Sequence, residues 1–197
     1  MADILTGLSF QDETLKNIEH PEEQFEKKEF ENCRFSNCNF SASSFQSCYF
    51  ENCLFEDCNL STIQVEDSLF RDVTFKDCKL MGILWSEVRK KGFSQSIRFQ
   101  TSVLNYSSFY SLDMQKCSFA DCQAVEVDFT EANLSKLVLH QMDLSGATFY
   151  RTNLKGTDLT TAVNYLFNPA DNFVKDMLVS LPDAVNLLYP FGIKVSL

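Results

Sequence analysis

A large apolar side chain recurs at every fifth residue over most of this chain. One run continues without a break from Phe25 to Trp85, and after a shift in register a second run continues from Phe99 to Leu159. A period of five fits neither regular element, because it moves successive side chains about 140° around an α-helix and to opposite faces of a straight strand. The apolar row faces one interior only if the chain turns a corner in every repeat. The sequence therefore predicts a coil of short segments around a continuous core.

The residue two places before each large side chain is predicted to point into the same interior, because alternate side chains of an extended segment share a face. All eight cysteines occupy this position: Cys33, Cys38, Cys48, Cys53, Cys58, Cys78, Cys117 and Cys122. A small apolar side chain in a core explains this placement without any bond to sulfur. Zinc ligands usually come as C-x2-4-C pairs, often with histidine, whereas the closest spacing here is C-x4-C and the only histidines are His20 and His140. We therefore predict buried free thiols rather than disulfides or a metal site.

The repeats resemble the A(D/N)LXX unit of the pentapeptide-repeat family. The segments that carry this resemblance are CRFSN, CNFSA, CYFEN, CLFED, ANLSK, TNLKG and TDLTT, and the match covers about residues 23–161. The resemblance implies an all-β fold, a right-handed quadrilateral β-helix with four repeats in each coil. Side chains twenty residues apart then stack in columns such as Phe30/Phe50/Phe70, Phe35/Phe55/Phe75 and Phe109/Phe129/Phe149. About six and a half coils spaced by ~4.8 Å make a rod roughly 30 Å long.

The five-residue period is broken between the two runs. Residues 86–98, SEVRKKGFSQSIR, have no repeat pattern and are predicted to leave the coil as a loop. The loop carries Arg89, Lys90 and Lys91, and loops on rigid scaffolds often hold binding residues. A corner that only restores the geometry of the coil explains the break equally well.

Both ends of the chain depart from the repeat. A stacked coil exposes unpaired backbone at its ends, so residues 1–22 are predicted to form a cap or an irregular first coil. In the tail, residues 162–197, the sequence predicts a helix between Ser180 and Pro190 and a last strand that starts at Phe191. Apolar residues of this tail are predicted to lie at a dimer interface or to fold over the end of the coil. These residues are Val185, Leu188, Phe191, Ile193 and Val195.

Acidic residues are concentrated in the first half of the chain. The formal net charge is −10, and residues 1–85 carry sixteen acidic and seven basic side chains. On the predicted coil, Glu31 and Glu51 are vertical neighbours, as are Asp57 and Asp77, and such like-charge pairs are mildly destabilising. The acidic strip either keeps the protein in solution or attracts a basic partner. Its charge density is about half that of duplex DNA, which carries one charge per ~1.7 Å.

Neither catalysis nor membrane insertion is indicated by the sequence. A filled β-helix offers little concavity, and the chain has two isolated histidines and no glycine-rich phosphate loop. We expect no enzymatic activity, no catalytic residues, no cofactor and no metal site. The start of the chain lacks the pattern of a signal peptide, and no run reaches the roughly eighteen apolar residues of a membrane span. We therefore expect a single-domain cytoplasmic protein.

The tail segments FNPADN and SLPDAVNLLYPFGIKV resemble the C-terminal extension of the branch of the family that contains the Qnr, MfpA and McbG proteins. This resemblance implies a homodimer joined end to end, which makes one acidic rod similar to duplex DNA in size and charge. It also implies binding to DNA gyrase or topoisomerase IV and protection of that enzyme from quinolones or peptide toxins, without direct binding to nucleic acid. The chain has one interruption where the best-known Qnr members have two loops.

Two functional hypotheses follow. In the first, the protein is a DNA mimic whose carboxylates replace phosphates, while Arg89, Lys90 and Lys91 contact a second surface of the topoisomerase. The carboxylates predicted for this role are Glu31, Glu51, Glu56, Asp57, Asp72 and Asp77. In the second, the protein is a structural or interaction scaffold for a different protein partner, which the sequence does not identify.

Overall fold

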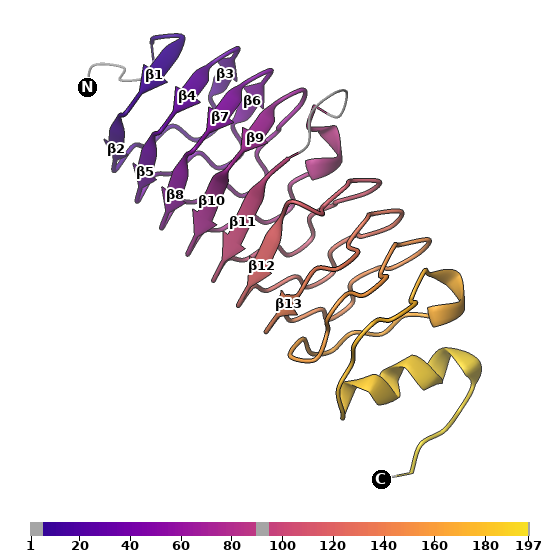
Figure 1. Cartoon of the computed structure of the whole chain (residues 1–197). Coiled ribbons are helices and arrows are strands. Elements are labelled where there is room, and N and C mark those ends of the chain that lie inside the picture. Colours follow the sequence, from indigo (N-terminus) through magenta and orange to yellow (C-terminus); the bar gives the residue numbers. More distant parts are fainter. Residues whose placement is uncertain (1–5, 90–94, 197) are drawn as a thin grey trace.

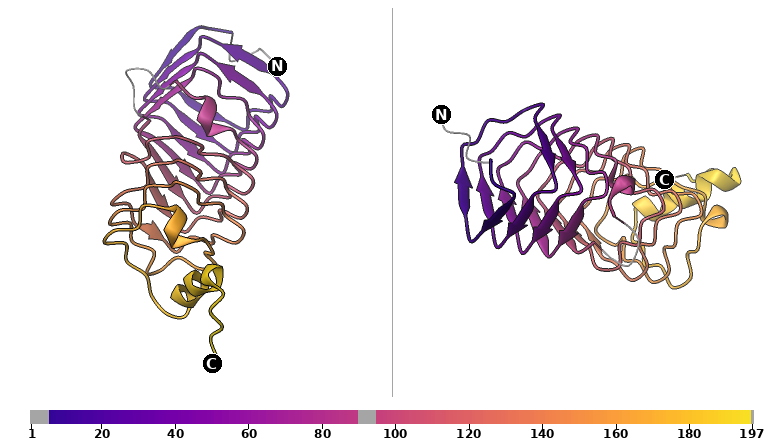
Figure 2. Two further views of the ribbon diagram at one scale, coloured as in Figure 1. Left: turned by 90° about the vertical axis from the view of Figure 1, so that its right-hand side faces the viewer. Right: turned by 90° about the horizontal axis from the view of Figure 1, so that it is seen from above.

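The chain forms a right-handed quadrilateral β-helix whose short parallel strands stack along one axis (Figure 1). The computed structural model describes residues 6–89 and 95–196. Two further views show successive coils stacked along one axis from the N-terminus to the C-terminus (Figure 2). The fold expected from the repeats is therefore confirmed.

Four faces enclose the core, and we number them in the order in which the chain passes through them. The first face contains β1 (Ser9–Gln11), β4 (Glu29–Glu31), β7 (Tyr49–Glu51) and β9 (Leu69–Arg71). The second face contains β2 (Thr14–Lys16), β5 (Arg34–Ser36), β8 (Leu54–Glu56), β10 (Val73–Lys76), β11 (Ile97–Gln100), β12 (Ser118–Ala120) and β13 (Leu139–His140). Single bridges such as the one between Asn39 and Asn59 link the third face. The fourth face contains β3 (Gln24–Glu26) and β6 (Ser44–Gln46).

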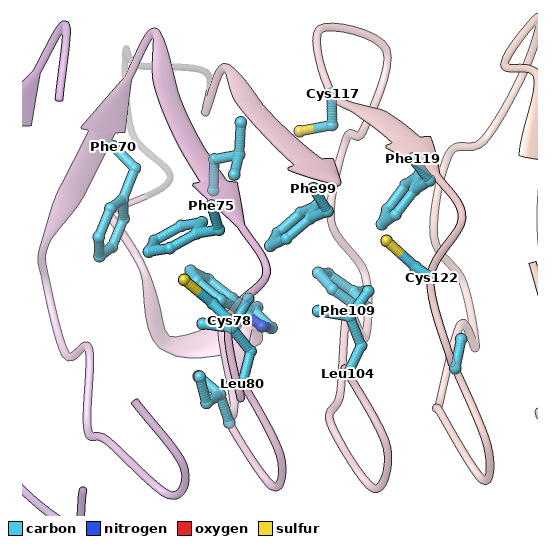
Figure 3. Close-up of a cluster of buried hydrophobic side chains, with 14 of the residues drawn as sticks. Phe70, Phe75, Cys78, Leu80, Phe99, Leu104, Phe109, Cys117, Phe119 and Cys122 are labelled. Atoms are coloured by element: carbon cyan, nitrogen blue, oxygen red, sulfur yellow. The ribbon is translucent and has the colours of Figure 1, made fainter. Parts of the chain in front are cut away.

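The large apolar side chains stack in the predicted columns. The rings of Phe35 and Phe55 lie 4.3 Å apart, and the rings of Phe55 and Phe75 lie 5.0 Å apart. The columns Phe30/Phe50/Phe70 and Phe109/Phe129/Phe149 are also stacked, with ring centroids 4.9 to 5.4 Å apart. Figure 3 shows the column of Phe75 continuing through Phe99 and Phe119. The step from Phe75 to Phe99 is four residues longer than the usual twenty, because the excursion lies between β10 and β11.

A left-handed residue forms the corner of nearly every repeat. It lies two places after the large side chain, as at Asn32, Asn52 and Asp72, whose φ angles are 53°, 52° and 53°. Asn and Asp tolerate this conformation better than most residues. The abundance of Asn and Asp at this position therefore reflects backbone geometry as well as contact with solvent, a cause that the sequence analysis did not identify.

The chain leaves the coil where the five-residue period breaks. The 3₁₀ helix η1 (Trp85–Glu87) begins this excursion, and the guanidinium of Arg89 forms two hydrogen bonds of 3.1 Å with the carboxylate of Asp67. Gln95 is buried, and its side-chain oxygen accepts a hydrogen bond of 2.8 Å from the backbone N–H of Phe70 on β9. This oxygen takes the place of a backbone carbonyl from a neighbouring strand. Its amide nitrogen donates to the carbonyl of Arg89. The excursion therefore closes on itself at its base.

The regular coil extends beyond both expected limits. β1 and β2 pair in register with β4 and β5, so residues 9–16 form a regular coil and not a cap or an irregular one. The physical reason is that Phe10 stacks on Phe30 at 5.0 Å, because Phe10 and Leu15 keep the five-residue register that only His20 interrupts before Phe25. At the other end, Asp158 still bridges to Leu178, inside the expected tail.

The tail is helical, but it differs from the expected structure. After η2 (Pro169–Asp171), the helix η3 (Asp183–Phe191) is a 3₁₀ helix that ends at Gly192, whose φ is 72°. The predicted last strand is wrong, because residues 192–196 form no strand in the described structure. A strand needs a partner, and this segment leads away from the coil (Figure 1). No helix in the described ranges is long and apolar enough to cross a membrane.

All eight cysteines are buried, as predicted, with at most 5% of any side chain exposed. Figure 3 shows Cys78 and Cys122 beside the phenylalanine column. Burial raises the pKa of the Cys53 thiol to about 12 and that of Cys48 to about 11. Such thiols are neutral and unreactive at pH 7.

We expect a maleimide reagent to label no cysteine of the folded protein within minutes, and all eight after denaturation. Intact-mass spectrometry before and after addition of guanidinium checks this result. Rapid labelling of several cysteines in the native protein would contradict their inward placement.

Candidate interaction surface

The six predicted carboxylates lie on two adjacent faces of the N-terminal half. Glu31 and Glu51 occupy equivalent positions on β4 and β7 of the first face, which confirms that they are vertical neighbours. Glu56 lies on β8 of the second face. The remaining three, Asp57, Asp72 and Asp77, occupy corners with left-handed backbone. The register of the coil therefore brings the predicted residues together on one side of the rod.

Glu56 lies between two cations from neighbouring coils. Lys76 donates a hydrogen bond of 2.8 Å to one of its carboxylate oxygens, and the guanidinium of Arg34 donates to the other. These bonds, with the one from Lys76 as the larger cause, lower the pKa of Glu56 to about 2. Glu56 is therefore charged at pH 7, but its charge is largely neutralised within the protein.

A pH dependence follows from this lowered pKa. The pKa of a glutamate is about 4.5 before folding and about 2 for Glu56 in the folded protein, so the stabilisation is present above pH 4.5 and is lost as the pH falls toward 2. We expect Glu56→Gln to reduce the fall in melting temperature across this window, and Glu66→Gln to leave it unchanged. Thermal unfolding measured by circular dichroism at several pH values tests this. Equal pH slopes for wild type and Glu56→Gln would contradict it.

Three further carboxylates also have cations nearby. Glu51 accepts hydrogen bonds from the hydroxyl of Tyr49 and from Arg71, at 3.2 Å for Arg71, and these bonds lower its pKa, with Tyr49 as the larger cause. Asp72 lies 3.9 Å from Arg98, and Asp77 lies 3.7 Å from Lys76. The sequence analysis missed these pairs, although Glu51 with Arg71 and Glu56 with Lys76 are twenty residues apart.

Glu31 and Asp57 differ from the other four predicted carboxylates. Neither has a cation within ion-pair distance among the residues that the structure describes. Asp57 and Asp77 line a shallow groove of about 420 Å³ between the second and third faces, together with Glu19 and Lys79. Three carboxylates and one ammonium group make this groove the part of the predicted surface that keeps most negative charge.

The groove offers no support for catalysis or metal binding. Its remaining lining consists of Asn37, Cys38, Asn39, Cys58 and Asn59. Across residues 6–89 and 95–196, no group of three or more His, Cys, Asp or Glu side chains is arranged to hold a metal ion. The groove can therefore attract a cationic surface.

Arg89, one of the three basic residues predicted to contact a partner, forms an ion pair within the protein. Arg89 pairs with Asp67 at the base of the excursion, and this ion pair lowers the pKa of the Asp67 carboxyl. Arg89 therefore fastens the excursion to the coil. Lys90 and Lys91 lie outside the described residues.

The apolar residues predicted for the dimer interface gather at the C-terminal end of the rod. Leu188, Phe191, Ile193 and Val195 expose 36% to 55% of their surface, and Val185 is half-buried. They belong to η3 and the segment after it, drawn in yellow in Figure 1. Only Leu187 of η3 is buried. The exposed set is therefore available for contact with another molecule, and Leu181 and Tyr189, which sequence reasoning missed, extend it.

Comparison with known proteins agrees with this fold. The model of a pentapeptide repeat region matches residues 28–109, and a model of eight pentapeptide repeats matches residues 125–160. Two similar solved structures are trypsin-treated variants of QnrB1, described as a plasmid-mediated fluoroquinolone resistance protein. One has a TM-score of 0.70 and covers 96% of this chain and 98% of that chain, at 18% identity. The other has a TM-score of 0.65 and covers 93% and 100%, also at 18% identity. No curated protein sequence matches.

Proposed function

We propose, given that the chain belongs to the pentapeptide-repeat family, that it is a non-enzymatic rod that occupies the DNA-binding surface of a type II topoisomerase, either DNA gyrase or topoisomerase IV. In this role it protects the enzyme from quinolones or peptide toxins. The observation that carries this proposal is the row of carboxylates on the first and second faces, held on a rigid scaffold. The description of QnrB1 as a fluoroquinolone resistance protein supports the same role.

The carboxylates contribute unequally to such binding. Glu31 and Asp57, with Glu19 beside Asp57 in the groove, present the least compensated charge, and Asp77 shares Lys76 with Glu56. Glu51 and Glu56 attract a cationic surface less strongly, because the partner must compete with Arg71, Arg34 and Lys76. Opposed charged surfaces are screened over about 10 Å at 0.1 M salt, so affinity should fall as salt rises.

A homodimer completes the proposed rod. η3 and residues 192–196 present exposed apolar side chains at one end of the coil, and two copies joined there would form a rod about twice as long. Its partners would then be itself and a topoisomerase, in the cytoplasm, with no direct contact to nucleic acid.

The decisive experiment is a gyrase supercoiling assay in the presence of a quinolone, with and without the purified full-length protein. We expect rescue of supercoiling at low salt, and a half-effective concentration about tenfold higher for the triple variant Glu31→Gln, Asp57→Asn, Asp77→Asn, as for three modest ionic contacts. The control removes three acids elsewhere: Glu66→Gln, Asp121→Asn, Glu126→Gln. No rescue, no inhibition and no binding with either topoisomerase would reject the proposal.

An interaction scaffold for a different protein is the second candidate. The ion pairs of Glu51, Glu56, Asp72 and Asp77 favour it, because paired carboxylates present less net negative charge than a row of phosphates. Failure of the topoisomerase assay would leave this function as the better supported one.

A further inference from the structure

Four lysines form two stacked pairs in adjacent columns on the C-terminal half of the rod. Bridges link Asp113 to Asn133, Asn133 to Asn153 and Asn153 to Phe173 along the first face. This register places Lys136 one coil after Lys116, at the corner that follows the first face. It also places Lys175 one coil after Lys155. All four side chains are exposed.

These lysines differ from several other cations of the coil. Elsewhere a cation commonly meets a carboxylate from an adjacent coil: Arg71 with Glu51, Lys76 with Glu56, Arg98 with Asp72, and Arg151 with Glu131. No ion pair involves the four lysines within the parts of the chain that the structure describes. Like charges opposed across neighbouring strands are destabilising. The coil therefore places two positive charges one coil apart in each pair, without an ion pair to neutralise them.

Exposed apolar side chains flank the lysines. Phe173 precedes Lys175 on the first face and is 56% exposed. Across the corner, on the second face, Val138 and Leu178 are 53% and 54% exposed and lie in one column, through bridges to Asp158. We call Lys116, Lys136, Lys155 and Lys175, together with Val138, Phe173 and Leu178, the lysine patch. Neighbouring exposed apolar side chains mark interaction sites, and clustered ammonium groups attract an anionic partner.

We infer that the lysine patch binds a short acidic segment of a protein partner, in which carboxylates alternate with apolar side chains. The patch spans three coil steps of ~4.8 Å, which is about the length of four or five extended residues. The carboxylates of such a segment would meet the ammonium groups, and its apolar side chains would cover Val138, Phe173 and Leu178.

The charge of the whole molecule favours a peptide over a nucleic acid. The net charge of −10 and the carboxylates of the N-terminal half repel a long polyanion, whereas a short segment carries little charge beyond the patch. This inference is independent of the proposed topoisomerase contact, which uses the opposite half of the rod.

The test is fluorescence anisotropy of a labelled decapeptide in which glutamate alternates with leucine or phenylalanine, titrated with the full-length protein at low salt. A decapeptide with glutamine in place of glutamate is the control probe. We expect the quadruple variant Lys116→Gln, Lys136→Gln, Lys155→Gln, Lys175→Gln to bind the acidic decapeptide about tenfold more weakly, as for four modest ionic contacts. The matched variant Lys16→Gln, Lys27→Gln, Lys28→Gln, Lys194→Gln changes the same charge elsewhere and should bind like wild type.

Each other outcome overturns the inference. Equal binding by the two quadruple variants, or equal binding of the glutamate and glutamine probes, would show that the lysine patch does not bind carboxylates. Tighter binding of a DNA duplex or of anionic phospholipid vesicles through the same lysines would assign the patch to a different partner. Self-association at low salt that the patch variant abolishes would assign it to a second copy of the chain.

Discussion

Replacement of Phe55 by alanine is expected to lower the free energy of unfolding by about 3–5 kcal/mol. Phe55 is 1% exposed, and its ring stacks between Phe35 and Phe75 at 4.3 and 5.0 Å. Backbone hydrogen bonds on both sides of β8, from Leu54 to Cys33 and from Thr74 to Cys53, fix the spacing of the coils. Because the coils cannot move together, the cavity left by the ring stays open, and the cost lies in the upper part of the usual range.

Chemical denaturation followed by circular dichroism measures this loss. The control is Phe173→Ala, which removes the same atoms from a side chain that is 56% exposed and should cost less than about 1 kcal/mol. A Phe55→Ala protein that melts within a degree or two of wild type would show that the stacked column does not stabilise the fold.

The sequence predicts the coil because its information is local and repeated. Each large apolar side chain must point inward, and the period therefore predicts that Cys78 is buried. That Phe30 stacks on Phe50 follows from the four repeats per coil that the family resemblance implies. The same reasoning fails at the ends of the coil. Phe10 keeps the five-residue register, but His20 interrupts the period between Phe10 and Phe25. Asn164 and Pro169 interrupt the period after Leu159. Pairing with the neighbouring coil continues the fold across these interruptions, and the local pattern does not record that pairing.

The candidate surfaces are only partly predictable for the same reason. The positions of Glu31 and Glu51 follow from the period, but neutralisation of a carboxylate depends on diagonal contacts such as that of Arg34 with Glu56. The contact of Arg98 with Asp72 depends on the register shift after the excursion. The closure of the excursion by Gln95 has no sequence signal, because a buried glutamine is recognised only by the backbone groups that it satisfies.

Introduction of charge into the tail is expected to convert a dimer into a monomer. Leu188 and Phe191 lie on η3 at the C-terminal end of the rod and are 37% and 55% exposed. Contact with a second copy would remove this apolar surface from water, which is the main driving force for association. Leu188→Asp with Phe191→Asp would place two carboxylates in that contact. We expect the dissociation constant to rise on the order of a hundredfold or more, as for the loss of central interface residues.

Size-exclusion chromatography with light scattering at micromolar concentration measures the change in mass. Leu8→Asp is the matched control, because Leu8 is 67% exposed at the opposite end of the rod and should leave the dimer intact. Far-UV circular dichroism of the double variant should match wild type, since both altered side chains lie outside the core. A monomeric wild-type protein, or a double variant that remains dimeric, would remove the end-to-end dimer. The proposed rod would then be limited to one copy of the chain, too short to follow the full DNA path across a dimeric enzyme with two equivalent halves.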